Sequence, residues 1–186
     1  MKMSVERLKA IVLYVLNRVD DKCLGKHELF KILYFASQKH LVRYGDVMIS
    51  DFYAMEYGPV PSTLCNYLRK TNNDIALSVK SDKETKYLYC AQSTRYVLRP
   101  LAEPDMGELS KVDIECLDEA IVENNGLSFK ELTRKSHDSA WNSAWNNPVG
   151  KRGARMDVIE IARAAGADEQ TIEYIQEELD LEAALR

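Results

Sequence analysis

The sequence predicts a mainly helical protein of the α+β class, a compact helical domain of about six to seven helices with a small antiparallel β-hairpin or three-stranded sheet. Apolar residues recur at helical spacing through most of the chain. Only 8 of the 186 residues are Gly and 5 are Pro, so long linkers are not expected. β-prone residues gather between positions 75 and 98. The length fits one domain over 1–186, with a helical core and small sheet in 1–100 and a helical C-terminal part in 109–186.

Two helices are predicted first, over residues 4–19 and 26–44. In the first, Ser4 is a candidate N-cap, and apolar residues repeat at intervals of three and four. The second helix is apolar on most of its sides, which is typical of a helix at the centre of a domain. Gly45 is expected to end it.

An extended stretch with two prolines follows the second helix. Residues 50–57 favour extended backbone and run into Gly58-Pro59-Val60-Pro61. The fixed proline angles, and the restriction on a residue that precedes proline, predict a sharp, stiff turn there. Pro61 suits the first turn of a third helix over 61–71. Three β-prone stretches come next, over residues 75–79, 86–91 and 94–98. Gln92-Ser93 is predicted to join the last two as a hairpin.

The second half of the chain is predicted to be helical. Residues 99–108 contain two prolines and a glycine and are expected to connect the halves. Ser110, Ser128 and Asp168 are candidate N-caps. Four helices are predicted here, over 110–124, 129–138, 155–165 and 168–184. Residues 139–150 hold two Trp and three Asn, and we expect a loop with at most one helical turn.

The net charge of −4 conceals an uneven distribution. Residues 1–100 carry 16 Lys/Arg and 10 Asp/Glu, whereas residues 101–186 carry 9 and 19. Either the halves neutralise each other in the fold, or a basic face meets an acidic partner. A sequence pI near 5.5 argues against strong phosphate contact, so a nucleic-acid partner is not favoured. A local group of basic residues comprises Lys130, Arg134, Lys135, Lys151, Arg152 and Arg155. The run from Lys151 to Arg155 is interpreted as a solvated loop.

The chain is expected to be cytoplasmic, with no membrane partner. Nothing at the N-terminus resembles a signal peptide, and the apolar run Ile11–Leu16 is far shorter than the ~20 residues that span a bilayer. The cysteines Cys23, Cys65, Cys90 and Cys116 form no CxxC pair. We expect them to be reduced, buried thiols, and we predict neither a metal site nor a cofactor.

The sequence favours binding over catalysis. His27 and His40 are 13 positions apart, which places them on different faces of one helix. His137 is the third histidine. The chain contains no GxSxG, HExxH, Walker loop or GxGxxG. We therefore predict that the protein is not an enzyme.

Three segments together resemble a known family. They are Lys31–Gly45 (KILYFASQKHLVRYG), Ser50–Ser62 (SDFYAMEYGPVPS) and Ser136–Trp141 (SHDSAW). This pattern is similar to the signature of the Panacea domain of SocA-like antitoxins. The chain departs from it at Ser37, where an acidic residue is common, and at residues 45–49, which lack the usual R-P-I-T loop.

The resemblance implies an antitoxin that neutralises a cognate toxin by direct protein binding, in a phage or mobile-element setting. Two alternatives stay open: an adaptor that delivers a toxin to a AAA+ protease such as ClpXP, and a DNA-binding autoregulator that uses the hairpin as a wing. Self-association is also left open.

Aromatic residues favour protein interfaces because they combine a large apolar body with a polar tip. The predicted partner-binding surface consists of Tyr53, Glu56, Tyr57, Pro59 and Trp141. The competing interpretation is that the Gly58–Pro61 segment only defines the fold and that Trp141 and Trp145 anchor the core.

Overall fold

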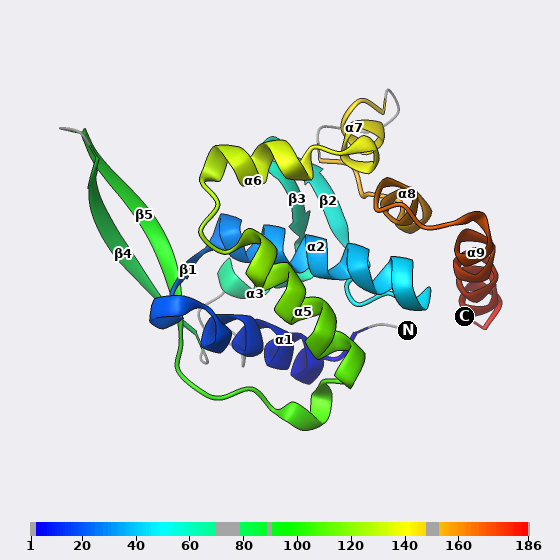
Figure 1. Cartoon of the computed structure of the whole chain (residues 1–186), viewed down its shortest axis with the longest axis horizontal. Coiled ribbons are helices and arrows are strands. Elements are labelled where there is room, and N and C mark those ends of the chain that lie inside the picture. Colours follow the sequence, from blue (N-terminus) through cyan, green and yellow to red (C-terminus); the bar gives the residue numbers. More distant parts are fainter. Residues whose placement is uncertain (1–2, 70–78, 89–90, 148–152, 186) are drawn as a thin grey trace.

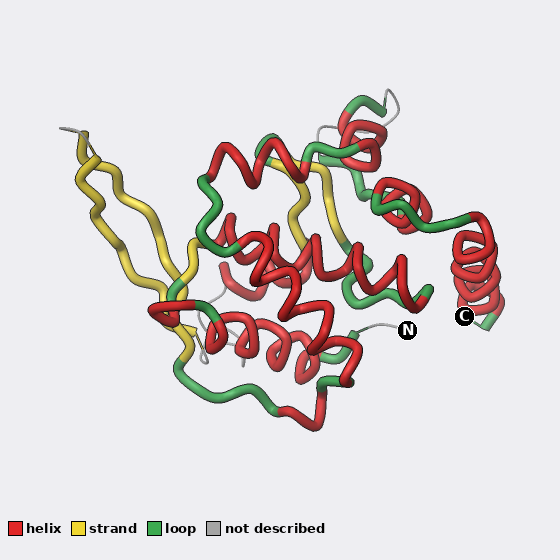
Figure 2. Tube along the Cα trace, in the orientation of Figure 1, coloured by secondary structure: helices red, strands yellow, loops and turns green. Residues whose placement is uncertain are grey.

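The computed structural model describes residues 3–69, 79–88, 91–147 and 153–185. Within them the chain forms eight α-helices and two small antiparallel sheets (Figures 1 and 2). The helices are α1 Val5–Arg18, α2 Lys26–Tyr44, α3 Ser62–Arg69, α5 Lys111–Asn124, α6 Phe129–Ser136, α7 Ser139–Trp145, α8 Val158–Ala164 and α9 Glu169–Ala184. Two 3-10 turns, Asp20–Lys22 and Met106–Glu108, complete the helical part.

The prediction of a mainly helical fold is confirmed, and α2 lies at the centre of this fold. It contacts α5, α6, α8 and α9, as well as strands of both sheets. Its side chains Ile32, Leu33 and Tyr34 are fully buried. One buried cluster extends from Leu8 in α1 to Ile175 in α9, so both halves of the chain contribute to the same core.

All seven predicted helices are present, but the expectation of a loop at 139–150 is wrong for its first half. Residues 139–145 form α7. Asp138 caps the start of this helix, and its carboxylate accepts a hydrogen bond from the Trp141 amide. Ala140, Trp141 and Ala144 are buried on one side of it. Packing of these three side chains outweighs the weak helix propensity of the asparagines.

The first sheet has three strands in the order β1-β5-β4: β1 Leu24–Gly25, β5 Ala91–Pro100 and β4 Val79–Leu88. The predicted hairpin is confirmed and projects from the helical body (Figure 1). Its turn is not at Gln92-Ser93, because Leu88 pairs with Ala91 and Gln92 pairs with Tyr87. The third strand is β1, which is too short to leave a pattern in the sequence. Most of the predicted 75–79 strand lies outside the described residues.

The second sheet consists of β2 Phe52–Met55 and β3 Gly58–Pro61, with Ala54 opposite Pro59. The predicted turn at Gly58–Pro61 is therefore wrong: that segment is a strand, and the turn lies at Glu56-Tyr57. Both prolines are tolerated because β3 is an edge strand. The other edge of β2 is covered by residues 154–156, whose Ala154 oxygen accepts from the Ala54 amide.

The two halves of the chain neutralise each other in part. Cationic side chains of α1 and α2 pair with carboxylates of α5 or its neighbours. These pairs are Arg7–Asp113 (2.9 Å), Arg18–Asp118 (2.9 Å), Lys39–Glu123 (2.6 Å) and Arg43–Glu119 (2.6 Å). The three pairs at the surface, which exclude the buried Asp113, each contribute less than about 1 kcal/mol.

Two further expectations concern cysteines and membranes. Cys116 is buried, Cys23 and Cys65 are half-buried, and Cys90 lies outside the described residues. No helix in the described part of the chain has the length and apolar character needed to cross a membrane.

Candidate functional site

The turn between β2 and β3 is held from both sides by side chains of two helices. The Trp141 indole of α7 donates to the carbonyl of Met55, before the turn, at 2.9 Å. The Lys31 amine of α2 donates to the carbonyl of Pro59, after the turn, at 2.8 Å. The backbone on each side of Glu56-Tyr57 is thus fixed relative to the helical body.

Gly58 allows the turn to lie close to these helices. Its φ of +98° is a conformation that L side chains rarely adopt. A Cβ added there would collide with the Ser136 hydroxyl of α6 and lie 2.9 Å from the end of the Lys31 side chain. Glycine is therefore required by backbone conformation and by space.

A stack of rings and a buried hydrogen bond fix α7. The His137 ring lies 3.6 Å from that of Trp141 and is almost parallel to it, and Trp145 continues the stack at 5.2 Å. The Tyr34 hydroxyl of α2 donates to the Asp138 carboxylate at 2.7 Å. This carboxylate also caps α7, so the helix that holds the turn is itself tied to α2.

Lys31 is a buried side chain that can carry a charge. Its side chain is 1% exposed, and no carboxylate in the described part of the chain pairs with it. Burial lowers its pKa to about 7. Burial and the charge of Lys31 also lower the pKa of His27 to about 4 and, by a smaller amount, that of His137. Because a substrate cannot reach the amine, the arrangement suits support of the turn rather than catalysis.

Replacing Lys31 by methionine is expected to flatten the pH dependence of stability above neutrality. Between the folded pKa of about 7 and the ordinary 10.5, the unfolded chain binds a proton that the folded protein does not. The free energy of unfolding of the wild type should then rise by about 2 kcal/mol between pH 7 and pH 9. Urea titrations at both pH values should show this rise in the wild type and not in Lys31→Met. An equal rise in both proteins would contradict the assignment.

Apolar side chains are exposed around the turn. Met55, Tyr57 and Phe129 are 44%, 53% and 48% exposed. The rings of Tyr57 and Phe129 meet edge to face at 5.3 Å, and His27 stacks under Phe129 at 4.1 Å. We call Met55, Glu56, Tyr57 and Phe129 the hairpin-tip patch.

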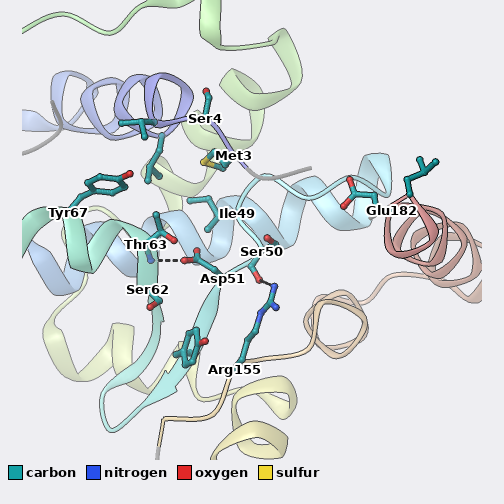
Figure 3. Close-up of a pocket in the computed structure, with 14 residues that line it drawn as sticks. Met3, Ser4, Ile49, Ser50, Asp51, Ser62, Thr63, Tyr67, Arg155 and Glu182 are labelled. Carbon is teal, nitrogen blue, oxygen red and sulfur yellow. Dashed lines mark hydrogen bonds between the residues drawn. The ribbon is translucent and has the colours of Figure 1, made fainter. Parts of the chain in front are cut away.

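The five residues predicted from the sequence lie in three different settings. Glu56 and Tyr57 are exposed in the hairpin-tip patch. Pro59 and Trp141 are buried beneath it and hold it in place. Tyr53 is not part of this arrangement, since it lines a pocket of about 840 Å³ between the start of α1, α3 and the end of α9 (Figure 3).

Sequence reasoning missed three contributors to the site. Phe129 gave no signal, because its approach to Tyr57 depends on how α6 lies on α2. Lys31 and Ser136 were part of the recognised segments, but nothing in the pattern assigned them a role. A lysine on a helix predicted to be apolar on most sides is the signal that could have found Lys31.

The described residues contain no group of three or more His, Cys, Asp or Glu side chains placed to hold a metal ion.

A comparison with known protein families identifies the family of this chain. A family model described as antitoxin SocA-like, Panacea domain, matches residues 29–142, more than half of the sequence. This chain belongs to the SocA-like antitoxin family. Searches of curated proteins and of solved structures gave no match.

The part that matches the Panacea domain contains the site. It includes most of α2, the β2–β3 hairpin, α6 and the Trp141 indole. Membership of an antitoxin family implies a toxin partner. Helices α8 and α9 lie outside the matched residues.

Proposed function

We propose that this protein neutralises a cognate toxin by binding it directly through the hairpin-tip patch, without catalysing a reaction. The supporting observation is that exposed Met55, Tyr57 and Phe129 surround a turn whose flanking carbonyls are both fixed by buried side chains. Tyr is enriched among the residues that dominate binding energy. A patch that is rigid before binding also loses little conformational entropy in the complex.

Co-expression with the product of the adjacent gene, taken as the toxin, tests the proposal. We expect growth of the host to be restored and the two proteins to co-purify at a defined stoichiometry. Toxicity that persists together with failure to co-purify would overturn the proposed function. The half-life of the toxin, measured in the same co-expressing cells, separates sequestration from the adaptor alternative. An adaptor would shorten this half-life in cells that contain the protease.

Tyr57→Ala is expected to weaken toxin binding about 30-fold or more, the usual effect of removing a dominant interface tyrosine. The side chain is 53% exposed, so the thermal midpoint should change little. Val122→Ala in α5 is a matched control, since this apolar side chain is 81% exposed on another element. Calorimetric titration of the toxin into each variant gives the affinities. Equal affinities for both variants would contradict a role for the patch.

The DNA-binding alternative stays a prediction. The β4–β5 hairpin projects from the body as a wing would (Figure 2). A gel shift with the protein's own promoter at physiological salt would discriminate, and absence of a shift at micromolar protein would exclude it.

A further inference from the structure

Helix α6 borders the hairpin-tip patch and carries two cations there. It packs against α2 and β3, so it runs beside the β2–β3 hairpin (Figure 1). Lys130 and Arg134 are exposed and four residues apart, which places them on one side of the helix. The same side continues to His137, whose ring stacks on Trp141 next to the backbone of Glu56. The two cations therefore lie on the side of α6 that meets the turn.

Neither cation is neutralised by a neighbouring side chain. Lys130 and Arg134 form no ion pair within the part of the chain that the structure describes. Lys135 lies on a different side of α6, where its amine donates to an amide oxygen of α5 at 2.7 Å. Hydrogen bonds from Ser128, and in smaller part the charge of Arg134, lower the pKa of Glu131. That carboxylate is held at the start of α6 by the Ser128 amide and hydroxyl, so it leaves both cations free to bind a partner.

The rest of the chain supplies no counter-charge that this balance leaves out. Residues outside the described ranges comprise five Lys or Arg and one Asp. The five that directly precede Gly153, which lies close to Met55, include Lys151 and Arg152 and no Asp or Glu. Residues 79–100, which form the β4–β5 hairpin, contain five Lys or Arg and two Asp or Glu. The α6 border of the patch is therefore basic.

Apolar and basic groups thus meet on one surface. Met55, Tyr57 and Phe129 are exposed beside Lys130 and Arg134. We propose that the hairpin-tip patch binds a segment of the cognate toxin that carries Asp or Glu side chains beside apolar anchors. The inference rests on the proposed function and names the chemistry of its partner. The anchors contact Tyr57 and Phe129, and the carboxylates lie against the two cations, where an arginine can bind a carboxylate through two hydrogen bonds.

Glu56 determines which way the acidic segment lies. Its side chain is exposed on the turn and has no ion-pair partner among the described residues. Like charges brought together oppose association, so the acidic residues of the segment lie over α6 and its apolar residues lie over the turn. Repulsion at one end and attraction at the other allow the patch to discriminate between partners.

Two pairs of charge reversals test the inference. Lys130→Glu with Arg134→Glu reverses the basic border. Lys9→Glu with Lys111→Glu makes the same change in net charge on α1 and at the end of α5 that is remote from α6. Calorimetric titration of the toxin should show binding at least tenfold weaker for the first variant and within about twofold of the wild type for the second. Circular dichroism melting establishes that both variants fold.

Two further measurements report on charge directly. The wild-type affinity should fall several-fold between about 50 and 500 mM NaCl, because salt screens exposed charges. The variant with both α6 cations reversed should lose this salt dependence, whereas the control variant should keep it. Glu56→Gln should bind the toxin at least as tightly as the wild type, since it removes a like charge; weaker binding would contradict the orientation of the segment.

Equal affinities of the two reversal variants, or tighter binding by the variant with reversed α6 cations, would overturn the acidic segment and leave the proposed function intact. If the wild type does not bind the product of the adjacent gene, the proposed function fails, and a peptide of leucine and glutamate is the probe instead. Binding of this peptide to the wild type and the control variant, but not to the variant with reversed α6 cations, supports the inference. Absence of peptide binding overturns it, and so does duplex DNA that binds through the same cations where the peptide does not.

Discussion

Gly58→Ala is expected to lower the free energy of unfolding by about 3 kcal/mol or more. A side chain at φ +98° strains the backbone by roughly 1–2 kcal/mol. The added Cβ would also collide with Ser136 and press on Lys31, and overpacking of a well-packed site typically costs a further 1–3 kcal/mol. Neither neighbour can yield freely, because Lys31 is bonded to Pro59 and Ser136 is buried in α6.

Two other glycines separate the strain from the collision. Gly126 and Gly166 have φ of +88° and +89°, and a Cβ at either would meet no atom within 4 Å. Their alanine variants should lose only the strain contribution of roughly 1–2 kcal/mol. Urea denaturation followed by circular dichroism measures all three variants. If Gly58→Ala is no more destabilising than Gly126→Ala, the close packing of the hairpin on α2 and α6 is not as described.

Signals that depend on neighbours in sequence predicted the helices well. Ser4, Ser110, Ser128 and Asp168 each accept a hydrogen bond from a backbone amide in the first turn of their helix, as the sequence indicated. Capping of this kind involves residues three positions apart, so it can be recognised without knowledge of the fold.

Features that depend on distant contacts could not be predicted in the same way. Proline angles alone indicated a turn at Gly58–Pro61, but the segment pairs with β2 and becomes an edge strand. For Trp141 the sequence left open a partner-binding role and a role as a core anchor. The side chain is buried, and its indole reaches the carbonyl of Met55, 86 positions earlier in the chain. Tyr57 was predicted as a partner-binding residue because an aromatic side chain beside a constrained segment is a local signal. Its neighbour Phe129 is brought to it only by the packing of α6.

Asp113→Asn is expected to cost about 3 kcal/mol near pH 5. The carboxylate is fully buried where α1, α2 and α5 meet. It accepts from Arg7 at 2.9 Å and from Ser110 at 2.8 Å, and His40 lies 3.3 Å away. Removing one partner from a buried ionic group leaves the other charges uncompensated, which is among the most destabilising single changes. Asp118→Asn is the control, because the same helix pairs this carboxylate with Arg18 at the surface and the loss should stay below about 1 kcal/mol.

The pH dependence of the same variant provides an independent check. Burial alone would raise the pKa of Asp113, but hydrogen bonds from His40 and Ser110 and the charge of Arg7 lower it to about 2. Its contribution, about 2 kcal/mol, is therefore complete above the ordinary value of 3.8 and is lost as the pH falls towards 2. For His40 burial opposes protonation, yet Asp113 and the Asp46 carbonyl raise the pKa, so that contribution is present below 6.5 and is lost as the pH rises through the folded value.

The difference in unfolding free energy between wild type and Asp113→Asn should consequently be largest at about pH 4–6 and smaller on either side. On the acid side the wild type loses the ionised carboxylate that the variant never had. On the alkaline side His40 becomes neutral in both proteins. A neutral imidazole needs no carboxylate to balance its charge, so the variant is at less of a disadvantage. Urea titrations at pH 3, 5 and 8 measure this difference. A difference that does not vary with pH would mean that the loss arises from packing alone and that the Arg7–Asp113–His40 contacts carry no net charge interaction.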